Sequence, residues 1–127
     1  MLTYVGKGYS DAFVANYDLI IDRLGGGEDI LLVAGPDDIC TPLLGTGSEH
    51  CHNESVVLRD RLSAEAVADV LGRPVTIGST FSIDADHLSR MRKAFAEGSV
   101  RRACTGCEWH ELCTSVSGAG YAGVRLA

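Results

Sequence analysis

Apolar residues recur at helical spacing near the start of the chain. Ser10 is a residue type that caps helices, and it predicts a helix from Asp11 to about Leu24. One face of this helix carries large apolar side chains, at Phe13, Tyr17, Ile20 and Leu24. The glycines at 25–27 end it. A short apolar run at 30–33 then predicts a buried strand, closed by the Gly35-Pro36 pair.

The rest of the pattern is helical, with long irregular connections. Residues 37–53 are rich in Gly, Pro, Thr and Ser and predict one loop. Further helices are predicted at 54–62, 63–71 and 84–98, with a last short helix through Trp109 and Leu112. Residues 75–81 are extended at best. The tail from Ser117 is expected to dock Val124 and Leu126 onto the core. The pattern has no linker. We therefore predict a mainly α fold with a small β component (α+β), in a single compact domain spanning residues 1–127.

Composition and charge narrow the class of protein. The chain has 127 residues, of which 46% are hydrophobic and 22% charged, which indicates a globular protein rather than a disordered one. Its formal charge of -6 argues against a general nucleic-acid binder. It has no apolar run long enough to cross a membrane, and its start lacks the features of a secretory signal. We expect a cytoplasmic protein that binds neither nucleic acid nor membrane.

Five cysteines are the most informative chemical feature of the chain. In a reducing compartment clustered cysteines are metal ligands or redox groups more often than disulfides, and an odd number fits a disulfide framework badly. Cys104 and Cys107 form a C-x-x-C pair in which Gly106 lets the backbone bend, and Cys113 adds a third thiolate within ten residues. The fourth would come from Cys40 or Cys51 in the loop. The domain is thus predicted to hold a metal centre with its cysteine-bearing loops.

More than one metal suits such a donor set. The alternative to a metal centre is a structural role, in which the cysteines are small buried hydrophobic residues. Thiolates bind both zinc and iron–sulfur clusters. Because Cys40 and Cys51 are too far apart in sequence to form a second tight zinc knuckle, we favour an iron–sulfur cluster, 4Fe–4S, with zinc as the alternative. Trp109 and Leu112 could shield the cluster, and its negative charge could be offset by two neighbouring cations, Arg101 and Arg102.

Several other polar residues are weaker candidates for a functional site. His50, His52 and His110 lie beside cysteines and could ligate a metal, but histidines in such loops are more often simple polar residues. Asp37-Asp38 after a proline favours a turn over a cation site. A locally basic stretch could dock an acidic redox partner; it comprises Arg90, Arg92, Lys93, Arg101 and Arg102. No nucleophile motif or phosphate loop is present, which disfavours an enzyme.

Three stretches of the sequence resemble the DUF1284 family of small bacterial and archaeal proteins, which are of unknown function and suspected to be iron–sulfur proteins. The stretches are Tyr4-Val-Gly-Lys-Gly-Tyr-Ser10, Val33-Ala-Gly-Pro-Asp-Asp-Ile-Cys40 and Cys104-Thr-Gly-Cys-Glu-Trp-His-Glu-Leu-Cys113. The resemblance implies cluster binding by these cysteines and no particular reaction. The resemblance implies an upstream Arg-Pro-His-His-Leu-Leu-Cys-like segment, so we hypothesise that Met1 is an internal methionine or that the chain is truncated. Some have a second loop cysteine where this chain has Leu43.

Three functions remain open at this point. The first is a cluster protein that transfers electrons or senses redox state, with ligands among Cys40, Cys51, Cys104, Cys107 and Cys113. The second is a zinc-stapled interaction module without a redox role. The third is a thiol enzyme that uses Cys104 and Cys107, although the chain lacks the βαβ pattern of thioredoxin-like proteins. We favour them in that order.

Overall fold

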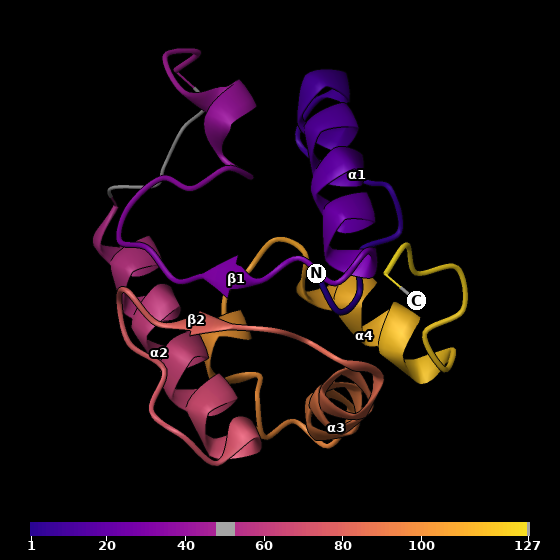
Figure 1. Cartoon of the computed structure of the whole chain (residues 1–127). Helices are drawn as coiled ribbons and strands as arrows, with labels where there is room; N and C mark the ends of the chain where they lie inside the picture. The colour runs from indigo at the N-terminus through magenta and orange to yellow at the C-terminus, as the bar shows by residue number, and fades with distance from the viewer. Residues whose placement is uncertain (48–52, 127) are drawn as a thin grey trace.

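A computed structural model describes residues 1–47 and 53–126, and its secondary structure is mostly helical (Figure 1). The described helices are α1 (Asp11–Gly25), α2 (Glu54–Leu71), α3 (Ala85–Ala96) and α4 (His110–Gly118), with 3₁₀ turns η1 (Thr41–Leu43) and η2 (Arg102–Cys104). An antiparallel pair, β1 (Ile30–Leu31) and β2 (Thr80–Phe81), forms the sheet. The fold is therefore mainly α with a small β component, as predicted. None of the described helices is both long and apolar enough to span a membrane.

Side-chain caps begin two helices at the predicted residues. The hydroxyl of Ser10 accepts a hydrogen bond from the backbone N–H of Phe13, at 3.1 Å. The carboxylate of Asp84 does the same for the N–H of His87, at 2.7 Å. Helix α3 buries the face that its spacing predicts, formed by Leu88, Met91 and Phe95.

Helix α2 corrects one prediction. The two helices expected at 54–62 and 63–71 are a single helix of 18 residues. Ser63 is exposed, so its hydroxyl faces solvent and does not compete for the backbone hydrogen bonds of the helix. Asn53 occupies the N-cap position, although its side chain makes no capping hydrogen bond. Gly72 ends the helix in the left-handed conformation, with φ of 68°.

The sheet is shorter and more exposed than predicted. Ile30 pairs with Phe81 and Leu31 with Thr80, and the ladder continues through a hydrogen bond from the N–H of Leu32 to the carbonyl of Ser79. Leu31 is 56% exposed and Val33 40%, because a two-stranded ribbon leaves one face to solvent. The apolar run at 30–33 is therefore not a buried strand.

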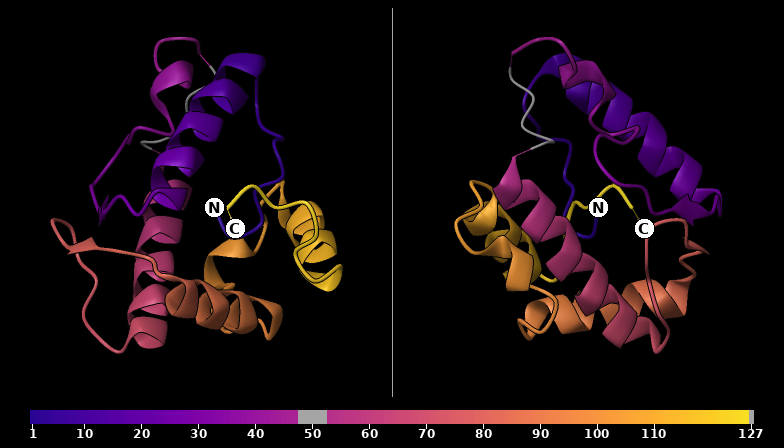
Figure 2. Two further views of the ribbon diagram at one scale, coloured as in Figure 1. Left: turned by 45° about the vertical axis from the view of Figure 1, so that its right-hand side comes forward. Right: turned by 90° about the vertical axis from the view of Figure 1, so that its left-hand side faces the viewer.

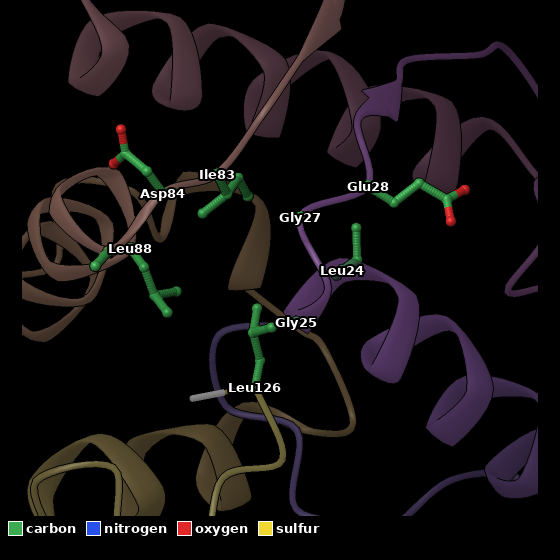
Figure 3. A pocket seen from close by; sticks show the side chains of 9 residues that line it. Leu24, Gly25, Gly27, Glu28, Ile83, Asp84, Leu88 and Leu126 are labelled. Carbon is green, nitrogen blue, oxygen red and sulfur yellow. The ribbon is translucent and has the colours of Figure 1, made fainter.

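The two ends of the described chain meet at the core. Tyr4, Ile21, Leu88 and Leu126 form one buried cluster, which confirms the predicted docking of Leu126. The backbone N–H of Arg125 donates to the carbonyl of Tyr4, so the terminal segments lie together, as Figure 1 also shows. A cavity of about 280 Å³ adjoins this cluster, between the end of α1 and the start of α3 (Figure 3).

Candidate metal centre

The C-x-x-C segment forms a tight turn at the end of η2. The N–H of Cys107 donates to the carbonyl of Cys104 at 3.1 Å, Thr105 has φ −61° and ψ 123°, and Gly106 has φ 73°. These angles define a type II turn, which needs a left-handed residue at its third position, as glycine permits. The ends of a β-turn lie within about 7 Å of each other at Cα. The structure thus brings Cys104 and Cys107 together, both half-buried.

Helix α2 packs against η2 and holds this turn in place. Arg59 donates from Nη2 to the carbonyl of Thr105, at 3.3 Å. The same nitrogen lies 3.6 Å from the position that a Cβ on Gly106 would occupy. Arg102 also reaches α2 and pairs with Asp69 at 2.7 Å. Sequence reasoning missed Arg59, because 46 positions separate it from Thr105 and no local pattern connects them.

Cys113 lies on α4 and its side chain contacts the N-terminal segment. The hydroxyl of Thr3 donates to Sγ of Cys113 at 3.2 Å. Cys113 also lines a pocket of about 270 Å³ together with Tyr17, Trp109 and Leu112. Burial raises the pKa of Tyr17. The third thiol is therefore half-buried beside aromatic rings, in a setting that differs from that of the turn.

Cys40 precedes η1, in a bend that an aspartate stabilises. Oδ1 of Asp37 accepts hydrogen bonds from the backbone N–H groups of Ile39, at 2.9 Å, and Cys40, at 3.2 Å. This confirms the interpretation of Asp37 as a turn residue. The remaining loop candidates, His50, Cys51 and His52, lie outside the described residues.

The predicted ligands are only partly gathered. Within residues 1–47 and 53–126, no group of three or more His, Cys, Asp or Glu side chains is arranged to hold a metal ion. The structure pairs Cys104 with Cys107 and leaves Cys113 bonded to Thr3. His110 begins α4 with an exposed side chain. What the described residues offer is a two-thiol turn with a third thiol on the next helix.

The basic residues around the turn contact other parts of the chain. The guanidinium of Arg101 packs over the ring of Phe95, with 4.7 Å to the ring centroid, and donates to the carbonyl of His110. Its Nε is buried and makes no hydrogen bond within the described residues. Arg90 pairs with Asp86, and Arg92 donates to the carbonyl of Leu126. The acidic redox partner expected for this stretch stays a prediction.

A family model described as a protein of unknown function (DUF1284) matches residues 8–113. The chain belongs to the DUF1284 family. The matched range contains all five cysteines and ends at Cys113. No curated protein and no solved structure matches the chain. The description of the DUF1284 family states no activity.

Proposed function

We propose that the protein binds an iron–sulfur cluster, of the 4Fe–4S type, and transfers electrons or senses redox state in the cytoplasm. Its ligands would be Cys104, Cys107, Cys113 and one of the two loop cysteines, Cys40 and Cys51. The observation that carries the proposal is the type II turn, which brings Cys104 and Cys107 close together. Its third position, Gly106, is left-handed, a conformation that glycine adopts without strain. Thiolates are the ligands that such clusters require.

The donor set fits a cluster in its chemistry and, in part, in its geometry. One hydrogen-bonded segment carries three of the cysteines, because the N–H of His110 donates to the carbonyl of Cys107 and that of Cys113 to the carbonyl of Trp109. Cys113 would exchange its hydrogen bond with Thr3 for a bond to iron. This is a change in one side chain of a helix that is already formed. The loop would supply the fourth ligand.

The surroundings of the cysteines suit a negatively charged group. Arg59 places a cation against the backbone of the turn. Trp109 is half-buried and packs edge-to-face on Tyr9, with 5.3 Å between the ring centroids. Charge and solvent exposure around the sulfur atoms are the features that set a cluster's reduction potential. When bound, the cluster would supply the electron-accepting centre, and these residues would shield it from water and stabilise its charge.

Zinc is the second candidate, and the contacts of the turn favour it in one respect. Arg59 and the pair of Arg102 with Asp69 attach the turn to α2, and α4 begins a few residues after the turn. A single ion bound there could act as a structural staple between helices. Such a module would be colourless and would unfold when the metal is chelated.

The deciding experiment measures iron, zinc and acid-labile sulfide in protein purified without oxygen, together with the visible absorption spectrum. Iron and sulfide in similar amounts, with absorption that bleaches on reduction, would support the cluster. Stoichiometric zinc without sulfide would replace it with the staple. Protein without either metal would refute both proposals and leave the thiol hypothesis.

Single Cys→Ser variants then identify the ligands. Substitution of Cys104, Cys107 or Cys113 should abolish the cluster. Of Cys40→Ser and Cys51→Ser, one should abolish it and the other should retain it, and the second is the matched control for the loss of a thiol. Retention of the full iron content in Cys107→Ser would contradict the assignment of the turn.

A further inference from the structure

A groove of about 630 Å³ lies between α1 and the segment that leads from β1 to η1. Both views of Figure 2 show this segment beside α1, and η1 packs against the helix. We call this hollow the α1 groove and define it by its apolar walls. One wall consists of Tyr17, Ile20 and Leu24 of α1, and the other of Ile30, Leu31 and Leu44. Its volume is that of a site for a ligand or a peptide side-chain cluster.

The apolar surface of the α1 groove continues onto its rim. Leu31, Val33 and Leu44 all line it, and their exposed fractions are 56%, 40% and 45%. Large apolar side chains that gather around a hollow mark an interaction site, whereas scattered ones carry no such meaning. These three come from two different stretches of chain, so the surface extends across the groove. A bound segment of chain would cover it better than a small ion would.

Charge indicates what kind of segment fits. Four carboxylates line the α1 groove, those of Glu28, Asp29, Asp37 and Asp38, against one guanidinium, that of Arg23. Arg23 pairs with Glu28 and lies 4.0 Å from Asp38. Four negative charges and one positive charge leave three negative charges in excess, and the Asp38 side chain is 82% exposed. A cationic occupant is complementary to this rim.

We infer that the α1 groove docks a short segment of a partner protein that carries bulky apolar side chains interspersed with lysine or arginine. The apolar side chains would enter between α1 and β1, and the cations would pair with the carboxylates of the rim. Cys40 lies between Ile39 and Thr41, which both line the groove, so a docked segment would lie beside a candidate ligand. The inference does not depend on whether the chain binds a metal.

The test uses three fluorescein-labelled synthetic peptides and fluorescence anisotropy with the full chain. The first peptide is an amphipathic Lys/Leu sequence, the second has Glu in place of Lys, and the third has Ser in place of Leu. The first should bind at least about tenfold more tightly than either of the others. Its affinity should fall between about 50 mM and about 300 mM salt without being lost, since apolar contacts are not screened.

Matched variants locate the binding. Leu31→Ser combined with Leu44→Ser should weaken binding of the Lys/Leu peptide about tenfold. The control is Val57→Ser combined with Leu58→Ser, which removes side chains that are 59% and 46% exposed on α2, outside the groove. It should bind like the parent chain. Asp38→Asn should reduce affinity at low salt more than at high salt. Circular dichroism checks that each variant folds.

Three outcomes would overturn the inference. One is an absence of measurable binding by the Lys/Leu peptide. Another is equal loss of binding in the two double variants, which would show that the peptide binds the acidic surface without using the groove. The third comes from light scattering: a dimer that becomes monomeric in the Leu31→Ser and Leu44→Ser double variant would make a second copy of this chain the occupant.

Discussion

Replacing Gly106 with alanine tests whether the cysteine turn depends on its left-handed glycine. Gly106 has φ 73°, at the third position of the turn. A Cβ placed there would meet Nη2 of Arg59 at 3.6 Å, which is an ordinary van der Waals contact. The substitution therefore introduces no clash, and its whole cost is the backbone strain of an L-residue in the left-handed region.

That strain has a calculable effect on stability. An L-residue other than Asn or Asp in the left-handed region costs about 1–2 kcal/mol. A chain of 127 residues has an unfolding entropy of about 0.27 kcal/mol/K, from about 2.1 cal/mol/K per residue. The melting temperature of Gly106→Ala should therefore fall by about 4–8 °C. The melting temperature of Gly106→Asn should fall less, since asparagine tolerates the left-handed region better than alanine does.

Thermal unfolding followed by circular dichroism measures the effect, and Gly118→Ala is the matched control. Gly118 is the last residue of α4, its φ lies outside the left-handed region and a Cβ there meets nothing within 4 Å. This control should keep or raise the melting temperature, because alanine favours the helix. A Gly106→Ala variant as stable as the parent, or an equal fall in both variants, would refute the turn argument. If the chain holds a cluster, Gly106→Ala should also lose iron before the control does.

Three further predictions concern the core and the caps. Burial, with a hydrogen bond to Asp18, raises the pKa of Tyr4 from 10.0 to about 12. Because the phenol of the unfolded chain ionises at a lower pH than that of the folded chain, this contribution to stability should be complete below a pH of about 10. It should fall by up to about 2 kcal/mol as the pH rises to about 12. Urea titrations should show a shallower fall in Tyr4→Phe, and an unchanged slope would contradict the assignment. Leu126→Ala, beside the 280 Å³ cavity, should cost about 2–4 kcal/mol in urea unfolding, against less than about 0.5 kcal/mol for Leu19→Ala at a side chain that is 65% exposed. Asp84→Ala removes a capping hydrogen bond of 2.7 Å and should cost about 1 kcal/mol by the same assay, with loss of less than about 0.3 kcal/mol counting against a capping role.

Elements set by local chemistry were predictable from the sequence. Ser10 and Asp84 cap helices because their side chains reach an amide three residues ahead, and no distant contact is needed. The division of α2 at Ser63 was wrong for a related reason. Serine disfavours a helix only when its hydroxyl competes for the backbone, and whether it does so depends on the direction of the side chain. The extent of β1 was also wrong, because burial of a strand depends on what covers it.

In the candidate site too, local features were predictable from the sequence and long-range contacts were not. The Cys104–Cys107 turn follows from spacing and from Gly106, which are local features. The hydrogen bond between Thr3 and Cys113 joins residues 110 positions apart, and sequence periodicity carries no information about such a contact. It places the third thiol against the N-terminal segment. The sequence thus predicted which residues could be ligands, and tertiary packing decides how they are oriented.

The cations near the cysteines show why neighbours in sequence are a poor guide to electrostatics. Arg102 lies close to Cys104 in the sequence, yet its guanidinium pairs with Asp69 of α2. The guanidinium of Arg101 packs on the ring of Phe95. The cation that contacts the turn is Arg59, which arrives because α2 packs on η2. The cation held against the backbone of this turn therefore comes from α2, a helix distant in sequence, so the stability of α2 and the chemistry of the turn should change together.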